Sequence, residues 1–363
     1  MGTLVPWIKT RSRGFDRLLP SRKAMLARAV HLIVRRYPQN PPALWLALIA
    51  TMLSMPAKSA NDEPITPIVP AEINAAKADL GRQLFQDVRL SHSNTVACVS
   101  CHRLDGGGGD GRMQSVGADG KQLDFNSPTI FNAALNYRLN WRGNFRTLEE
   151  QNEAVLLDRQ LMNTSWKELL PKLRADPDYV RSFVALYGSS PDRAHVLDAL
   201  ATFQRSLLTP GSRFDRYLNG EPGALAPDEE RGYQLFKSYG CVACHQGMNV
   251  GGNLFQVFGV FSDPVIMRWR GTGASLGRFT ITGFESDRYV FRVPSLRNVA
   301  VTAPYFHHGA VSSLPEAVDI MARVQLGRGL PVQDIDLIVK FLGTLTGEYQ
   351  GRSLTAETDQ APR

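Results

Sequence analysis

The sequence predicts a mainly α-helical protein of two similar lobes with long loops, placed after an N-terminal segment for export. Three observations predict this fold class. A short helical pattern occurs twice and each time leads into the same cysteine motif, apolar residues at helical spacing fill the stretch between the two copies, and a basic and then apolar segment begins the chain. With 363 residues the chain has room for two compact domains and additional segments.

The first 60 residues have the order of a secretory signal. Basic residues precede an apolar run at 43–53, and the small residues Ala57, Ser59 and Ala60 follow it. The run is short for a membrane span, and the polar, Pro-rich stretch after it argues against a buried core helix. The basic part is longer than in a usual signal, so either the signal starts downstream or residues 1–60 form an uncleaved anchor. We expect export to the periplasm, with attachment to the inner membrane if the segment is kept.

The positive charge of the chain belongs to this leader. Residues 1–60 hold ten Lys and Arg, from Lys9 to Lys58, against the single acid Asp16. Subtracting the resulting +9 from the net charge of +7 leaves −2 for residues 61–363. The body therefore has no electrostatic footprint for a phosphate backbone, and we expect no nucleic-acid partner.

The internal repeat sets LGRQLFQDVRLSHSNTVACVSCH (residues 80–102) beside RGYQLFKSYGCVACH (residues 231–245). Each copy predicts a short amphipathic helix that leads into its cysteines. Helical spacing also covers 147–173 and 177–208, while the Pro-, Gly- and acid-rich stretch 209–230 predicts a boundary. The predicted domains are the signal or anchor at 1–60, an N-terminal domain at 61–210, a C-terminal domain at 211–350 and a tail at 351–363.

Haem enters this prediction through the cysteines, all four of which fall in two Cys-x-x-Cys-His motifs. The two thiols of such a motif can add to the vinyl groups of haem, and the adjacent histidine can bind the iron. A zinc site would need a second Cys/His pair in each half, and a thioredoxin-like pair would need a strand–helix context. We therefore expect two covalent c-type haems, one on Cys98, Cys101 and His102 and one on Cys241, Cys244 and His245. The Gly-rich loops after the motifs are expected to wrap the haem edges.

The sixth ligand of each iron decides whether a haem passes electrons or binds small oxidants. Outside the motifs the histidines are His31, His92, His195, His307 and His308. His31 lies in the leader, and His195 is better explained as a packed or solvated helix residue. Methionines are therefore the main candidates for axial ligands.

Several longer segments resemble one known family. They are NSPTIFNAALNYRLNWRG, LEEQ, GMNVGGN, VFRVPSLRNVAVTAPYFHHG and EAVDIMARVQLG. They are similar to the bacterial dihaem cytochrome c peroxidases and the related methylamine-utilisation dihaem proteins, over about residues 70–346. The resemblance implies reduction of hydrogen peroxide with electrons from a small periplasmic donor, a cytochrome c or a cupredoxin. Members of the family are commonly dimers.

Carried over by position, the resemblance implies the roles of individual residues. It makes His245 the proximal and Met321 the distal ligand of the C-terminal, electron-accepting haem, and His102 the proximal ligand of the N-terminal haem, where peroxide reacts. Trp141 matches the tryptophan between the two haems, and His307 matches a histidine close to the haem region. The residues that match an interdomain Ca²⁺ site are Asn126, Thr302 and Pro304.

Two positions depart from the family pattern. The loop before NSPT normally carries a histidine that caps the peroxidatic iron, but Ala118 stands there, with Met113 the only weak ligand in the loop. In the distal pocket Gln151 matches the catalytic glutamine, whereas the position of the acid/base glutamate is Leu161. A shift of one to three residues would bring Asp158 or Gln160 into the pocket, and of these only Asp158 could transfer a proton.

Two functions follow from this pattern. The first is a peroxidase that is active without prior reduction, because the capping histidine is missing. The second is a relative with a degraded acid site that acts in electron transfer or in the oxidative maturation of a protein partner.

Overall fold

The computed structural model describes residues 63–261 and 273–354. The predicted export segment and residues 355–363 of the predicted tail lie outside this part of the chain. The ten described helices are α3 (Ala75–Gln86), α4 (Leu148–Leu157), α5 (Trp166–Arg174), α6 (Pro177–Tyr187), α7 (Arg193–Ser206), α8 (Arg213–Leu218), α9 (Pro227–Ser238), α11 (Phe279–Thr282), α12 (Leu314–Leu326) and α13 (Val332–Gly343). The strands form two small antiparallel pairs, β1 (Phe255–Val257) with β2 (Val290–Arg292) and β3 (Glu348–Tyr349) with β4 (Arg352–Ser353). The prediction of a mainly α fold is confirmed.

The helices begin and end where the sequence supplies caps. The side chain of Thr147 accepts the N–H of Glu150 at the start of α4, and Asp176 followed by Pro177 starts α6. The predicted helical stretch 147–173 is two helices, because Asn163 adopts positive φ and Ser165 caps a new helix. Likewise 177–208 is interrupted at Gly188, which ends α6 in the left-handed conformation.

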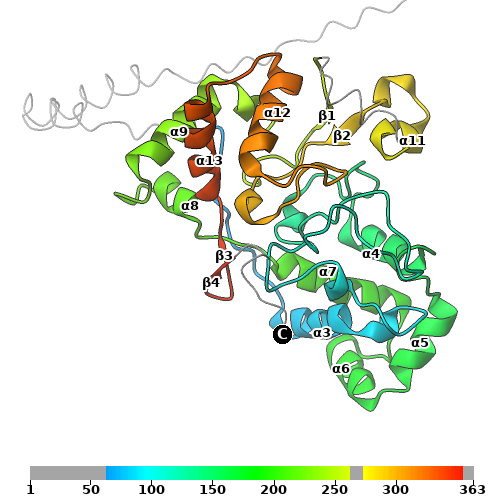
Figure 1. Cartoon of the computed structure of the whole chain (residues 1–363). Coiled ribbons are helices and arrows are strands. Elements are labelled where there is room, and N and C mark those ends of the chain that lie inside the picture. The colour runs from blue at the N-terminus through cyan, green and yellow to red at the C-terminus, as the bar shows by residue number, and fades with distance from the viewer. Residues whose placement is uncertain (1–62, 262–272, 355–363) are drawn as a thin grey trace, which may run out of the picture. The chain divides into compact units, whose positions relative to one another are not determined.

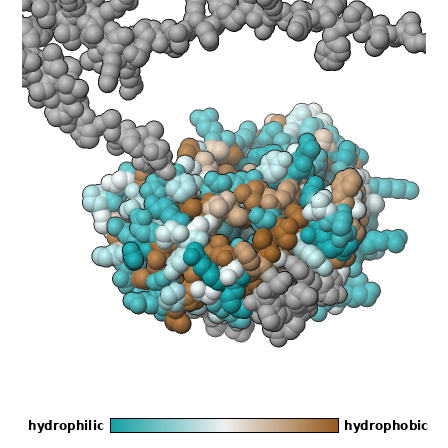
Figure 2. Space-filling view, turned by 90° about the horizontal axis from the view of Figure 1, so that it is seen from above, coloured by the Kyte–Doolittle hydropathy of each residue, from teal (hydrophilic) through white to brown (hydrophobic). Residues whose placement is uncertain are grey.

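The apolar side chains form two main cores within residues 63–354. The N-terminal core gathers α3, α5, α6 and α7 around residues such as Leu84, Phe183 and Phe203, and the C-terminal core gathers α8, α9, α12 and α13 around residues such as Tyr233 and Phe341. Figure 1 shows these two groups of helices in the lower and upper parts of the view. Figure 2, which looks onto the upper face, shows apolar residues gathered across the middle of that face. No helix in the described residues is long and apolar enough to cross a membrane.

Each core contains the same close helix crossing. A Cβ on Gly81 of α3 would lie 2.0 Å from the carbonyl oxygen of Ala199 in α7, and a Cβ on Gly232 of α9 would lie 2.0 Å from that of Leu337 in α13. Only glycine allows backbones to approach this closely. Gly81 and Gly232 are the second residues of LGRQLF and RGYQLF, so the repeated sequence corresponds to a repeated pair of packed helices.

The end of the described chain returns to the N-terminal core. The ring of Tyr349 in β3 lies 5.1 Å from that of Phe131, and Leu354 belongs to the N-terminal core. The stretch 209–230, predicted as a boundary, contains the short helix α8, whose Phe214 is fully buried in the C-terminal core. The chain thus enters the C-terminal core by α8 and packs against the N-terminal core again at Tyr349 and Leu354. The predicted domain limits stay predictions.

Candidate functional site

The two cysteine motifs adopt the same turn. Each follows a helix, α3 or α9, and the N–H of the motif histidine donates to the carbonyl of the first cysteine at 3.0 Å in both copies. The four thiols are half-buried and none forms a disulfide. The motifs are therefore two equivalent local structures that present two free thiols and an imidazole each.

The motif histidines are held in one tautomer. Nδ1 of His102 donates to the carbonyl oxygen of Gly108 at 3.2 Å, and Nδ1 of His245 donates to that of Val250 at 3.3 Å. Burial lowers the pKa of both imidazoles, that of His245 to about 4. Each ring is therefore neutral near pH 7 with the lone pair of Nε2 available, which is the form that ligates a metal.

The thiols fit covalent attachment better than metal binding. Burial raises the pKa of Cys98 to about 12 and that of Cys241 to about 11, so both stay protonated near pH 7 and lack the reactivity of a redox-active thiolate. Among residues 63–261 and 273–354, no group of three or more His, Cys, Asp or Glu side chains could hold a metal ion. Free thiols beside an oriented imidazole are what haem attachment needs.

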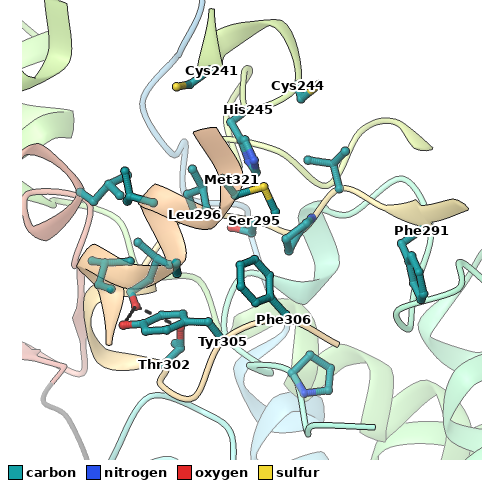
Figure 3. Close-up of a pocket in the computed structure, with 18 of the residues that line it drawn as sticks. Cys241, Cys244, His245, Phe291, Ser295, Leu296, Thr302, Tyr305, Phe306 and Met321 are labelled. Atoms are coloured by element: carbon teal, nitrogen blue, oxygen red, sulfur yellow. Dashed lines mark hydrogen bonds between the residues drawn. The ribbon is translucent and has the colours of Figure 1, made fainter. Parts of the chain in front are cut away.

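A cavity of about 370 Å³ surrounds the second motif. Cys241, Cys244 and His245 line it from one side and Met321 of α12 from another. Figure 3 shows the side chains of His245 and Met321 pointing toward each other, with apolar residues such as Leu296 around them. A thioether opposite an imidazole in an apolar cavity fits a haem with two protein ligands.

The chain behind His245 leaves no room for a side chain at Gly251. A Cβ there would lie 2.3 Å from the carbonyl oxygen of Pro294 and 3.2 Å from Nδ1 of His245, and φ is +125°. Glycine at this position lets the backbone pack directly against the imidazole. This role of Gly251 was not predicted from the sequence.

Trp141 and His307 meet at the junction of the two cores. Their ring centroids are 6.5 Å apart, and His307 also stacks on Phe291 at 4.2 Å. Nε1 of Trp141 donates to the carbonyl oxygen of Asn126 at 2.8 Å. Burial among aromatic rings lowers the pKa of His307 to about 3, so this imidazole is neutral at any physiological pH.

The junction is built from a second repeated segment. The N–H of Asn126 donates to the carbonyl of His307 at 2.9 Å, and the N–H of Arg292 donates to the carbonyl of Trp141 at 3.0 Å. The bridge between Leu139 and Phe145 around Trp141 has its counterpart in the bridge between Tyr305 and Val311 around His307. Trp141 and His307 therefore occupy equivalent turns, and each half donates one hydrogen bond to the turn of the other.

The same repeat has a shared anchor. Asn132 and Asn298 both adopt the left-handed conformation, and the side-chain amides of both donate to Oγ1 of Thr209, at 2.8 and 3.1 Å. Each asparagine follows a proline by four residues, in NSPTIFN and RVPSLRN. This shared spacing is a second sequence repeat, beside the one that ends in the cysteine motifs.

The three predicted calcium residues line one cavity. Asn126, Thr302 and Pro304 all line the cavity described above. Nδ2 of Asn126 donates to the carbonyl of Arg112 at 2.8 Å, so the amide oxygen Oδ1 points away from Arg112. Calcium takes oxygen ligands, so a site here would depend on this amide, on backbone carbonyls and on water.

Comparison with known proteins places the chain in a family. A model of the family described as "Di-haem cytochrome c peroxidase" matches residues 75–223. The cytochrome c551 peroxidase of Nitrosomonas europaea is 42% identical over 311 residues, which cover 84% of this chain and 90% of that protein. The chain belongs to the di-haem cytochrome c peroxidase family. The cofactors of this family are two c-type haems.

Two further relatives support the assignment. The cytochrome c peroxidase Ccp of Escherichia coli K12 is 40% identical over 292 residues, which cover 80% of this chain but only 62% of that protein. The crystal structure of a MauG-like protein associated with microbial copper homeostasis superposes with a TM-score of 0.66 at 30% identity, covering 78% of this chain and 93% of that one.

In this member of the family the predicted distal residues lie in α4 and in the turn that follows it. Gln151 is in α4, and its Oε1 atom is buried without a hydrogen-bond partner in the described structure. Leu161 follows the helix and is half-buried, and Met162 is buried in the N-terminal core. The carboxylate of Asp158 is exposed and accepts the N–H of Gln160 at 2.8 Å, so it caps a surface turn.

The two departures from the family pattern are neighbours in space. Ala118 lies in a small hairpin closed by the bridge between Val116 and Gln122. Its N–H donates at 3.1 Å to the carbonyl oxygen of Gln160, the residue before Leu161. A Cβ on Gly117 would lie 2.2 Å from the same oxygen, so the hairpin packs against the turn without a side chain between them. Met113 is 55% exposed.

Proposed function

We propose that the protein is an exported di-haem peroxidase that reduces hydrogen peroxide to water with electrons from a small periplasmic protein, a cytochrome c or a cupredoxin. The reaction takes up two electrons and two protons as the O–O bond breaks. Bound haem would supply a redox-active iron and, where one axial position is open, a place for peroxide. The observation that carries the proposal is the junction, where reciprocal hydrogen bonds fix Trp141 and His307 between the two motif-bearing cores.

The residues around the two haems would have different tasks. His245 and Met321 would hold the C-terminal iron from both sides, which suits electron transfer. His102 would hold the N-terminal iron from one side only. Trp141, with its indole N–H fixed on Asn126, would keep the segment between the haems rigid. We propose that Asn126, Thr302 and Pro304 hold one Ca²⁺ at the same junction.

The family resemblance makes Gln151 the polar residue that would orient peroxide. Its amide oxygen is buried and unpaired, so a hydrogen bond from bound peroxide would compensate its desolvation. An amide cannot exchange protons as a carboxylate does, and Leu161, at the family position of the acid, cannot either. Positioned acid–base groups typically contribute 10²–10⁴-fold, so peroxide cleavage here is expected to be slow unless another acid serves the site.

A second function is supported by the same departure. With Leu161 and Ala118 at the two family positions, the protein would act as an electron-transfer module or in the oxidative maturation of a protein partner. The likeness to a MauG-like structure is compatible with this function. The apolar residues of the face in Figure 2 offer area for a partner protein or for a second copy in a homodimer.

Steady-state peroxidase turnover of the purified di-haem protein separates the two functions. The assay would follow oxidation of a reduced cytochrome c or cupredoxin on addition of hydrogen peroxide, with and without prior reduction of the enzyme. Efficient turnover without prior reduction supports the peroxidase. The second function is supported if turnover is slower by the 10²–10⁴-fold that a positioned acid–base group typically contributes, and if small ligands bind rapidly to the oxidised protein.

A further inference from the structure

Arg292 is a buried cation without an acidic partner. It is only 5% exposed, and no carboxylate among the described residues pairs with it. Its guanidinium donates through Nε to the carbonyl of Asn140 at 3.2 Å and through Nη1 to Oδ1 of Asn136 and the carbonyl of Val293, at 3.2 and 3.3 Å. All three acceptors are neutral.

A second buried arginine of the same segment does have an acidic partner. Arg297 is 1% exposed and forms an ion pair at 2.7 Å with Asp215, which is itself 2% exposed. Burying a charge without a partner is unfavourable, which is why buried arginines are usually paired. Desolvation at Arg292, with no acid to oppose it, lowers its pKa to about 10, so it stays charged at pH 7. The missing counter-charge at Arg292 is therefore a specific feature of this position.

The position of Arg292 indicates where the counter-charge would come from. Arg292 and the nearby Pro294 both line the cavity that holds His245 and Met321, whereas Arg297 does not. The carbonyl oxygen of Pro294 lies at Gly251, beside the imidazole of His245. Haem c is a dicarboxylate, so the group that fills this cavity would bring two propionates with it.

We propose that Arg292 binds a propionate of the C-terminal haem and joins that haem to the segment carrying Trp141. The proposal rests on the haem assignment made above for Cys241, Cys244 and His245. Arg292 suits this role because its main-chain N–H donates to the carbonyl of Trp141 and its Nε donates to the carbonyl of Asn140. One residue thus contacts the haem edge with its side chain and the bridging segment with its backbone.

The arginine would have a measurable effect on the haem. A positive charge held close to a haem in a poorly screened interior favours the reduced state, which carries one positive charge less. Arg292 would therefore raise the reduction potential of the C-terminal haem. As a positioning residue it would alter this potential without altering the axial ligands.

The test is spectroelectrochemical titration of the purified di-haem protein. Arg292→Gln should keep two haems and the thioether band but shift the C-terminal potential to lower values, and Arg292→Lys should restore part of the shift. The control is the double variant Arg297→Gln with Asp215→Asn, which removes a buried pair outside the cavity and should leave the potential in place. An unchanged potential in Arg292→Gln would overturn the proposal.

Two further readouts keep the test decisive. If Arg292→Gln loses haem or does not fold, Arg292→Lys carries the comparison, and the propionate bending mode in its resonance Raman spectrum should differ from wild type. An unchanged mode and potential in Arg292→Lys would then refute the proposal. If wild-type protein lacks the thioether band, the assignment of Met321 fails instead, and that failure is distinct from the one tested at Arg292.

Discussion

Replacing Leu161 by glutamate should raise peroxide turnover. Leu161 is half-buried at the end of the turn after α4, and its N–H is fixed on the carbonyl of Asp158 at 3.1 Å, so the backbone does not need the leucine side chain to hold its shape. Leucine and glutamate are similar in size. Partial burial beside Met162 would raise the pKa of the new carboxyl group, as acid–base catalysis near pH 7 requires.

The expected gain is about 10²–10⁴-fold in kcat/KM for peroxide, which is about 2.7–5.4 kcal/mol at 1.36 kcal/mol per tenfold. It would be measured as donor oxidation by the purified di-haem protein. Two controls isolate the proton transfer. Leu161→Gln has the same size without a titrating group, and Leu157→Glu places the same charge on a residue that is 42% exposed.

Three results would contradict the reasoning. Wild-type protein could already react at the rate of an efficient peroxidase, Leu161→Glu could add nothing, or Leu161→Gln could match it. In the first two cases an acid from elsewhere would serve the site. Asp158→Asn then decides whether that acid is the exposed carboxylate after α4, because only loss of activity in this variant would identify it.

Four further predictions test other parts of the site. The pyridine haemochrome of wild-type protein should give two c-type haems per chain that survive acid-acetone extraction, and Cys244→Ala should remove the C-terminal haem alone; a count of one in the wild type would contradict both motifs. Met321→Ala should abolish the thioether-to-iron charge-transfer band and lower the potential of the C-terminal haem, whereas a packing methionine would cost only stability. Ala118→His should slow the binding of small ligands to the oxidised protein, measured by stopped-flow mixing, and an unchanged rate would show that the hairpin cannot reach the iron. The pKa of His307 falls from about 6.5 in the unfolded chain to about 3 in the folded one, so the unfolded state binds more protons between these values and stability should fall as pH is lowered from about 6.5 to about 3; thermal unfolding of His307→Phe should show a flatter dependence over this window.

Part of the site was predictable from short spacings alone. Two thiols and an imidazole within five residues are brought together by one turn of chain, whatever the rest of the fold does, and the turns at Cys98 and Cys241 are the same. The helix before each motif was predicted from its apolar period, and α3 and α9 confirm it. The interruptions at Asn163 and Gly188 were missed, because apolar spacing continues across a capped break.

Other residues were identified only through the family resemblance. Nothing in the local pattern around Trp141 or Met321 separates them from core residues of the same type. Their placement in one cavity is compatible with the roles implied by the resemblance, and those roles stay predictions.

Tertiary structure alone decided which distant residues meet. It places Ala118 against the residue before Leu161, forty-two positions along the chain, and it exchanges hydrogen bonds between Asn126 and His307 and between Arg292 and Trp141. It also leaves Arg292 without the acid that Arg297 has in Asp215. Motif spacing is a local property, set by the few dihedral angles of one turn. The charge balance of a buried side chain depends instead on every segment packed around it, so only the folded chain shows that Arg292 lacks a partner.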